Sequence, residues 1–265
     1  MKNKRGGKLR DYKIVTMHSE ELDREVKIYI SVPSKYEETN TAYPVLYMHD
    51  GHIAFDDYEK EDPNAVGIMD LYFNSDKYPE VILVGLDSTK TRNDELLPVK
   101  FENKRTGNSV GGKANLYMDF MVNDVKPMID KNYRTLSDRE NTGLLGMSLG
   151  GVCTFYAATK YIEYFSMFAG ISNAFVPVRK EIVKMLVEAD LSSVKKMYLD
   201  VGTKESESEE NSLLYIESNK EVYAVLKEKL HEDKLLFDYV EGAGHNEYDW
   251  QKRFPNVIQF LFKDE

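Results

Sequence analysis

Cysteine and long apolar runs are scarce in this chain of 265 residues, and both shortages exclude classes of protein. The single cysteine, Cys153, excludes a disulfide within the chain and suits a reducing compartment. The longest apolar runs, such as VILV at 81–84, are far shorter than the roughly 20 residues that a membrane-spanning helix needs. No apolar segment follows the basic start MKNKRGGKLR, so it does not resemble a secretory signal. We therefore expect a cytoplasmic protein that does not act at a membrane.

Positive charge is also in deficit, because 35 Lys and Arg face 45 Asp and Glu, for a formal charge of −10. Phosphate binding needs a cationic face, so this balance argues against a nucleic-acid partner or a membrane-surface role. Internal repeats and Pro- or Ser-rich linkers are absent as well, and a chain of this length can bury one large core. We expect a basic flexible tail at 1–10 and a single domain over 11–265.

Short apolar segments predict β-strands, and helical patterns lie between them. The strands are expected at 26–32, 45–48, 81–86, 142–146, 166–169, 197–201 and 235–240. The helices are expected at 64–73, 114–130 (with Pro127 as a local interruption), 151–161, 178–189, 212–230 and 247–262. This alternation predicts an α/β fold whose mostly parallel sheet has helices on both faces. The two early strands could pair as a hairpin at one edge.

Residues 87–113 form a long connection without clear periodicity. Connections of this length in a compact domain are usually functional or disordered. A mobile surface excursion is one interpretation. We favour a wall or lid beside a substrate site.

Two stretches share one pattern: GMSLGG at 146–151 and GNSVGG at 107–112. The pattern G-x-S-x-G is typical of a nucleophile elbow, in which a buried strand enters a strained serine and a helix leaves it. Ser109 follows the polar stretch ENKRTGN, which cannot be a central strand, whereas Ser148 follows TGLLGM and precedes the helical pattern LGGVCTFYAATKY. The context therefore predicts that Ser148 is a nucleophile and that Ser109 is not.

A serine hydroxyl needs a base, usually a histidine held by a carboxylate. The candidate bases are His18, His49, His52, His231 and His245. In a fold with such an elbow the order along the chain is serine, acid, histidine, so only His231 and His245 qualify. His231 closes a charged helix, where a histidine needs no catalytic role, while His245 lies in a Gly-flanked loop after the last strand. We expect His245 to be the base.

The acid should follow strand 197–201, in the segment LDVGTKESESEEN. Glu205 is favoured because it lies three residues beyond the turn-forming Gly202, whereas Asp200 lies inside the strand pattern. Glu207 and Glu209 remain alternatives. The other glutamates of ESESEE are typical of a solvated acidic loop.

Acyl transfer also needs N–H donors aimed at a developing oxyanion. We expect the backbone N–H of Leu149 to be one, and that of His52 to be the other, with Ile53 as its alternative. The stretch around them also contains His49, Asp50, Asp56 and Asp57, but its H-x-x-H spacing fits no strong metal motif, so no metal is expected. His49 is expected to be a hydrogen-bonded histidine near the strand end.

Four further side chains are assigned provisionally. Asp50 is expected to bond loop backbone or to line the pocket. Arg92, together with Lys100, Lys104 and Arg105, could meet an anionic substrate, although solvated loop charges are the alternative. Trp250 could pack against the loop of His245 or contact substrate. Cys153, on the helix after Ser148, is expected to be buried packing.

The quoted motifs, in their order, resemble the Putative esterase family. They are YPVLYMHDGHIAFDD, TRNDELLP, YMDFMVNDVKPMIDKNYRT, GMSLGG, DVGTKES and GAGHNEYDW, and the resemblance covers roughly residues 12–262. The family contains feruloyl and acetyl xylan esterases, enterochelin-type siderophore esterases and mycolyltransferases. The resemblance implies an α/β-hydrolase fold with about eight strands, a triad of Ser148, Glu205 and His245, and oxyanion donors at Leu149 and His52.

This sequence departs from the family pattern in three respects. Glu205 stands where relatives commonly carry Asp, and His52 stands where many carry Gln or Leu. Secreted members have signal peptides, and none is recognised here, which weakens cell-wall substrates.

The resulting hypothesis is a serine esterase without a cofactor, which acts through an acyl-enzyme on a small-molecule ester. Short acyl esters, acetylated sugars and siderophore-type lactones are all compatible. One alternative is acyl transfer to a sugar or other alcohol with the same triad. Another, of a different class, is a non-catalytic binding module on a hydrolase scaffold. The oligomeric state is not predicted.

Overall fold

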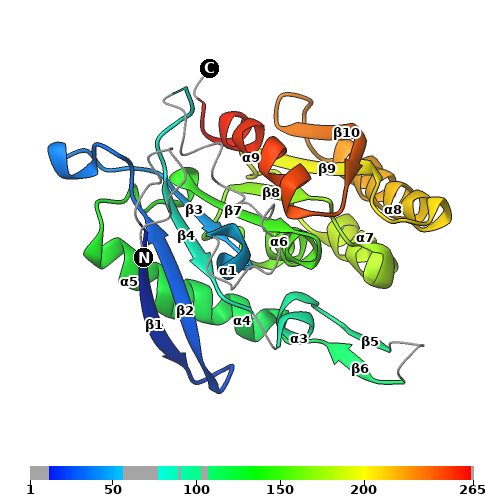
Figure 1. The fold of residues 1–265 in the computed structure, drawn as a ribbon, viewed down its shortest axis with the longest axis horizontal. Coiled ribbons are helices and arrows are strands. Elements are labelled where there is room, and N and C mark those ends of the chain that lie inside the picture. Colours follow the sequence, from blue (N-terminus) through cyan, green and yellow to red (C-terminus); the bar gives the residue numbers. More distant parts are fainter. Residues whose placement is uncertain (1–11, 56–76, 89–90, 103–106, 264–265) are drawn as a thin grey trace.

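The structure is a computed structural model that describes residues 12–55, 77–88, 91–102 and 107–263. It contains an eight-stranded sheet with the order β1-β2-β4-β3-β7-β8-β9-β10 (Figure 1). The strands are β1 (Lys13–Ser19), β2 (Arg24–Ser31), β3 (Val45–Met48), β4 (Ile82–Leu86), β7 (Thr142–Met147), β8 (Met167–Ile171), β9 (Lys196–Lys204) and β10 (Leu235–Gly244). The pairs β1/β2 and β2/β4 are antiparallel, and the others are parallel. The predicted mostly parallel sheet is thus confirmed.

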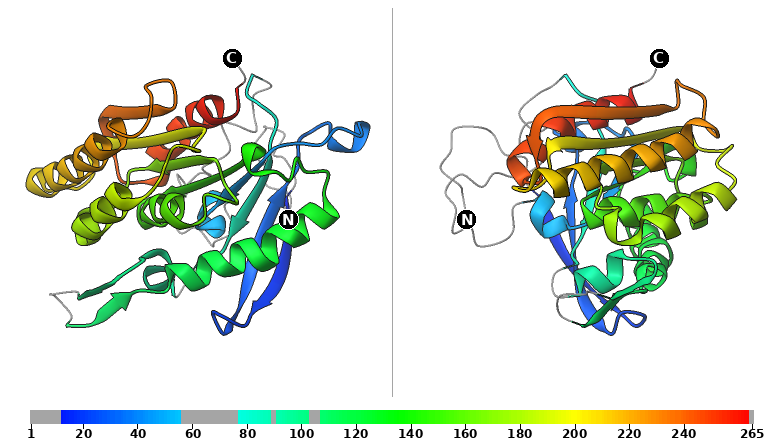
Figure 2. Two further views of the ribbon diagram at one scale, coloured as in Figure 1. Left: turned by 180° about the vertical axis from the view of Figure 1, so that it is seen from behind. Right: turned by 90° about the vertical axis from the view of Figure 1, so that its right-hand side faces the viewer.

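Both faces of the sheet are covered by helices, as predicted. These are α1 (Gly51–Ala54), α3 (Arg92–Leu96), α4 (Ala114–Phe120), α5 (Lys126–Asn132), α6 (Leu149–Lys160), α7 (Arg179–Glu188), α8 (Glu209–Lys227) and α9 (Glu247–Phe262). In Figures 1 and 2, α9 lies across the sheet from α6 and α7. The short strand β3 shows the reason for two covered faces: Val45 and Tyr47 enter the core with α4–α8, while Leu46 and Met48 enter the core with α9.

One expectation about the fold is wrong, and one strand was not predicted. The edge hairpin is formed by β1 and β2, not by the strands at 26–32 and 45–48, because β3 pairs with β4 and β7 in the middle of the sheet. The short connection between β1 and β2 makes them antiparallel neighbours, while β1 itself escaped prediction. It is an edge strand with an exposed face, so its apolar pattern is weak.

The predicted helix 114–130 is one continuous run of three segments. Between α4 and α5 lies a five-residue π-helical turn, Met121–Val125. Pro127 has no N–H to donate, and the π turn directly ahead of it lets the chain remain helical. The interruption that Pro127 predicts is therefore a local change of helix type.

The described part of 87–113 is more regular than the sequence indicates. It contains α3 and a two-stranded antiparallel sheet of β5 (Lys100–Glu102) and β6 (Ser109–Gly111). This hairpin projects from the body of the molecule (Figure 1).

Several predicted features lie outside the described residues. They are the tail at 1–10, the helix at 64–73, and Asp56, Asp57, Lys104 and Arg105. Among the helices that are described, none has the length and apolar character needed to cross a membrane.

The register of the parallel strands brings distant residues to one edge of the sheet. Gly244, the last residue of β10, lies opposite Lys204, the last residue of β9. The residues that follow, His245 and Glu205, therefore leave the sheet side by side. Because all the parallel strands end at this edge, it also receives Ser148 after β7, as is usual for sites in α/β folds.

Candidate active site

Ser148 joins strand β7 directly to helix α6, with φ 58° and ψ −120°. This positive φ is strained for a residue with a Cβ, and here it turns the serine out of the sheet. Gly146 and Gly150 make the turn possible, because a Cβ on Gly146 would lie 2.1 Å from the carbonyl carbon of Gly150. A Cβ on Gly151 would lie 2.0 Å from Asn173 Oδ1. Gly146 and Gly151 of GMSLGG are therefore required by close packing.

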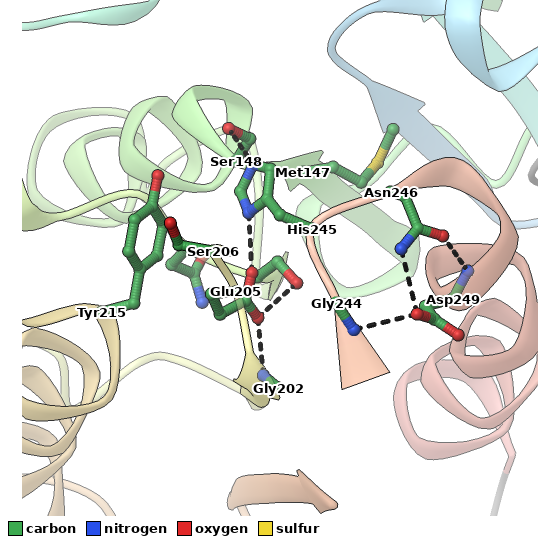
Figure 3. Close-up of polar contacts among 12 residues, drawn as sticks. Met147, Ser148, Gly202, Glu205, Ser206, Tyr215, Gly244, His245, Asn246 and Asp249 are labelled. Carbon is green, nitrogen blue, oxygen red and sulfur yellow. Dashed lines mark hydrogen bonds and ion pairs between the residues drawn. The ribbon is translucent and has the colours of Figure 1, made fainter. Parts of the chain in front are cut away.

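The Ser148 hydroxyl meets an imidazole and, beyond it, a carboxylate (Figure 3). Ser148 Oγ lies 2.8 Å from His245 Nε2, and His245 Nδ1 lies 2.7 Å from Glu205 Oε2. A carboxylate only accepts hydrogen bonds, so the proton on the ring belongs on Nδ1. Nε2 then presents a lone pair to the serine hydroxyl.

Glu205 is buried, and two hydrogen-bond donors hold its carboxylate in addition to His245. Its Oε1 accepts the backbone N–H of Gly202 at 2.6 Å and the Ser172 hydroxyl at 2.7 Å. The alternative acid, Asp200, is also buried, but it bonds the Tyr198 hydroxyl and other groups, and no contact with His245 is recorded for it. The further alternatives, Glu207 and Glu209, are exposed. The structure thus brings Glu205, of the four carboxylates considered, to the imidazole.

The loop that carries His245 is fixed by the start of helix α9 (Figure 3). Asp249 Oδ2 accepts the N–H of Gly244 at 2.9 Å and the side-chain amide of Asn246 at 3.0 Å. Asn246 caps the helix in return, because its Oδ1 accepts the N–H of Asp249 at 3.0 Å. Burial raises the pKa of Asp249, but these hydrogen bonds and that from Lys252 outweigh it and keep the pKa below its ordinary value.

Two aromatic rings pack edgewise on the imidazole of His245. Tyr215 of α8 lies 5.4 Å away and Trp250 of α9 lies 5.0 Å away, measured between ring centroids. Trp250 is buried, so of the two roles considered for it, the structure shows the packing contact. These rings restrict the tilt of the imidazole between Ser148 and Glu205.

The other candidate serine and histidines lie elsewhere. Ser109 is exposed at the start of β6. His18 lies on β1 beside Glu25, and His231 is exposed beside Asp233. His49 is buried with its Nδ1 3.2 Å from the Tyr117 hydroxyl, and burial lowers its pKa to about 4, so it is neutral at pH 7.

Asp50 and Arg92 form a buried fork beside the elbow. Arg92 Nε and Nη2 each lie 2.8 Å from one oxygen of Asp50, which also accepts the Ser88 hydroxyl. Burial opposes the charge on Asp50, but the Arg92 guanidinium outweighs it and holds the pKa of Asp50 below its usual range. Arg92 Nη2 also lies 3.5 Å from the carbonyl of Met147, so this cation reaches the residue before Ser148.

The two expected oxyanion donors both begin helices. Leu149 is the first residue of α6, and the first N–H groups of a helix have no partner within it. His52 is the second residue of α1, which follows the left-handed residue Asp50. The alternative donor, Ile53, is already engaged, since its N–H donates to the carbonyl of Asp50 at 2.9 Å.

A cavity of about 260 Å³ adjoins Glu205, one of the three linked side chains. It is lined by Val176, Glu205, Ser206, Asn211, Leu214 and Tyr215. Cys153, by contrast, is a buried core residue of α6, and burial raises the pKa of its thiol. Within the described ranges, no three His, Cys, Asp or Glu side chains gather as a metal site would require.

Comparison with known proteins places this arrangement in a family. The family model described as Putative esterase matches residues 19–261. The chain belongs to the Putative esterase family. This membership supports ester hydrolysis.

Individual members and neighbours agree with that assignment. The uncharacterized protein YbbA of Bacillus subtilis (strain 168) is 23% identical over 245 residues, which cover 91% of this chain and 93% of YbbA. An IroE-like serine hydrolase from Shewanella oneidensis superposes with a TM-score of 0.75 at 20% identity, over 96% of this chain and 80% of that one. The enterobactin esterase of Shigella flexneri gives 0.73 at 16% identity, over 97% and 60%. These two structures establish the α/β-hydrolase fold.

Sequence reasoning missed three residues of this esterase-family site: Ser172, Tyr215 and Arg253. Ser172 follows β8, while Tyr215 and Arg253 lie within helical patterns. Nothing in the local pattern distinguishes them from packing or surface residues. The one signal was positional, because any residue directly after a parallel strand is a candidate for the site edge, and Ser172 is such a residue.

Proposed function

We propose that this protein is a serine carboxylic-ester hydrolase in which Ser148, His245 and Glu205 form a catalytic triad. One observation carries the proposal: the strained Ser148 stands in a continuous hydrogen-bonded line with His245 and Glu205, at 2.8 Å and 2.7 Å. Membership of the Putative esterase family supports the reaction class.

In the first half-reaction Ser148 Oγ attacks the acyl carbon while His245 Nε2 takes its proton. The carbon–oxygen bond to the alcohol then breaks, His245 returns the proton to the leaving alcohol, and an acyl-enzyme remains on Ser148. In the second half-reaction His245 deprotonates water, which attacks the acyl carbon and releases the acid. Glu205 holds the ring in the tautomer that this cycle needs and stabilises the imidazolium.

The negative charge that develops on the carbonyl oxygen requires donors close to Ser148. We assign this role to the backbone N–H groups of Leu149 and His52. The support is positional, since Leu149 begins α6 immediately after the nucleophile and His52 lies in α1, after the adjacent strand β3.

The substrate is proposed to be a small acyl ester: a short-chain ester, an acetylated sugar or a siderophore-type lactone. A cavity of about 260 Å³ lies below the roughly 300–1,000 Å³ that is usual for ligand pockets, which favours a small acyl or alcohol group. Arg92 is proposed to contact the substrate, with Asp50 holding it in place and not contacting substrate itself. Because one structural neighbour is an enterobactin esterase, a siderophore-type lactone should be tested as a substrate.

The test is hydrolysis of p-nitrophenyl acetate with EDTA present, by the wild type, Ser148→Ala and Ser109→Ala. Ser109 is the matched control because it occupies the same G-x-S-x-G-G pattern on the projecting hairpin. We expect the wild type and Ser109→Ala to hydrolyse the ester and Ser148→Ala to fall to background. Mass spectrometry after brief mixing should find the acyl group on Ser148.

Retention of wild-type turnover in Ser148→Ala would refute the triad. If the wild type itself is inactive on acetate, a series of esters and a fluorophosphonate probe decides between a selective acyl pocket and a non-catalytic scaffold. Labelling of Ser148 supports the former, and its absence counts against the proposal.

A further inference from the structure

Behind the carboxylate of Glu205 lies a second, fully buried polar layer that the sequence did not reveal. Its centre is Arg253, on helix α9, which is 5% exposed. The fork of its guanidinium joins two groups: Nη1 lies 2.6 Å from Asp200 Oδ1, and Nη2 lies 2.9 Å from Ser172 Oγ. Ser172 Oγ in turn lies 2.7 Å from Glu205 Oε1.

The chemistry of these groups determines which way the Ser172 hydroxyl points. An arginine can only donate, so the oxygen of Ser172 must accept from Arg253. The single hydroxyl proton is then directed to the remaining acceptor in reach, Glu205 Oε1. A hydroxyl without this cation could rotate, whereas here its direction is fixed.

The backbone of Ser172 is equally constrained. Its φ is 48°, a strained value for a residue with a side chain, and its N–H donates to Asp200 Oδ1 at 2.7 Å. The chain on both sides is tied to the elbow, because Ser148 N–H donates to the carbonyl of Ile171 and Ala174 N–H donates to the carbonyl of Ser148. Strain persists only where the surroundings hold it, and such positions cluster at functional sites.

The charges of this layer also fit a role in supporting Glu205. Two buried carboxylates, Asp200 and Glu205, each bond Ser172, and the buried cation Arg253 contacts Asp200 and the Ser172 hydroxyl. Burial, with the nearby Glu205, raises the pKa of Asp200 to about 6 in spite of Arg253. The remaining groups that face the layer are the Tyr198 hydroxyl on Asp200, the ring of Tyr215, and His245. The positive charge of Arg253 offsets the negative charge of Asp200. The negative charge of Glu205 therefore remains to interact with His245.

We propose that Ser172 and Arg253 are positioning residues that aim the Glu205 carboxylate at His245. This inference rests on the proposed triad. Arg253 sits on the helix whose first turn also holds the His245 loop through Asp249. One helix therefore sets the position of the base directly and that of the acid through Ser172.

The experiment compares the wild type, Ser172→Ala and Ser166→Ala. Ser166 is the matched control because its hydroxyl is as buried, at the opposite end of β8, and has no hydrogen-bond partner within the described structure. Two readouts are used: kcat and KM on p-nitrophenyl acetate, and the low-field proton NMR signal of the His245 Nδ1–H bonded to Glu205. His245→Gln identifies that signal.

We expect Ser172→Ala to lower kcat about tenfold with little change in KM, and to shift or broaden the low-field signal. Ser166→Ala should leave both unchanged. A Ser172→Ala protein with wild-type kcat and an unshifted signal would overturn the inference. The NMR arm needs no substrate, so it tests Ser172 even if ester hydrolysis, and with it the proposed function, fails.

A second variant separates the charge of Arg253 from its geometry. Arg253→Lys keeps a cation beside Asp200, so the protein is expected to fold, but an ammonium cannot bridge Asp200 and Ser172 as the guanidinium does. We expect a smaller fall in kcat, about threefold to tenfold, with a shifted signal. Wild-type values for both readouts would remove Arg253 from the proposal.

Discussion

The two stretches GMSLGG and GNSVGG carry the same glycines around a serine, yet their surroundings have almost nothing in common. Ser148 of the first stretch lies between a fully buried strand and a helix, with His245 at hydrogen-bond distance. Ser109 of the second is exposed and begins a three-residue strand on a projecting hairpin (Figure 1). A short motif therefore has chemical meaning only through the elements that enter and leave it.

The glycines themselves serve different purposes in the two stretches. Gly146 and Gly151 do not adopt positive φ and are needed because a Cβ would overlap the backbone of Gly150 and the side chain of Asn173, respectively. Gly107, Gly111 and Gly112 have φ of 69°, 94° and 88°, which favour glycine, and at Gly111 a Cβ would also lie 2.4 Å from the carbonyl oxygen of Val99. The same letters thus reflect packing alone in one place and chiefly backbone conformation in the other.

The largest expected effect tests which serine is the nucleophile. Ser148→Ala should lower kcat by roughly 10⁴- to 10⁶-fold, because the attacking oxygen is lost while binding survives. Ser109→Ala should stay within about twofold of wild type, since an exposed hairpin serine contacts no reacting atom. Steady-state hydrolysis of p-nitrophenyl acetate measures both, and equal losses in the two variants would contradict the assignment.

The next effect sharpens the comparison by removing the carboxylate that bonds His245, the partner of Ser148. Glu205→Gln should lower kcat by roughly 10³- to 10⁴-fold, because the amide no longer stabilises the imidazolium or selects its tautomer. Glu207→Gln, two residues away and exposed, is the control and should be nearly silent. The same assay decides, and comparable activity of both variants would argue for another acid.

A smaller effect separates the two kinds of glycine. Gly146→Ala should destabilise the protein by about 3 kcal/mol, because its Cβ would overlap the backbone of Gly150. Gly107→Ala should cost about 1 kcal/mol, because the space is open and only the positive φ opposes it. Urea unfolding of each variant gives the free energies of unfolding. A larger loss in Gly107→Ala than in Gly146→Ala would show that the cost of positive φ on the hairpin exceeds the cost of overlap at the elbow.

The smallest effect concerns the buried carboxylate behind the GMSLGG elbow. Asp200 has its pKa raised from 3.8 to about 6, so the folded state binds its proton more tightly than the unfolded state. Its contribution to stability is complete below about pH 4 and is lost as pH rises through about 6, by at most about 3 kcal/mol. The difference in unfolding free energy between the wild type and Asp200→Asn should fall accordingly between pH 4 and pH 7. A difference that does not vary with pH would contradict this.

Much of the fold and of the site was accessible from the sequence, for identifiable reasons. The strands at 45–48, 142–146 and 197–201 are continuous apolar runs, and such runs can only be buried between two layers. Ser148 and His245 were reachable because the predicted nucleophile and base follow strand ends in a known chain order. The edge strand β1 escaped, because a strand with an exposed face has a weak apolar signal.

What the tertiary structure alone decided is which residues, far apart in the chain, meet. The sequence determined the class of fold, the elbow serine and the loop histidine, because these depend on local patterns and chain order. The sequence favoured Glu205 and left Asp200 open. The contact of Glu205 with His245, and the contacts of Ser172 and Arg253, depend on the register of β9 with β10 and on the placing of α9 across the sheet. Those contacts span up to 81 residues, and no local pattern encodes a distance between side chains that only packing brings together.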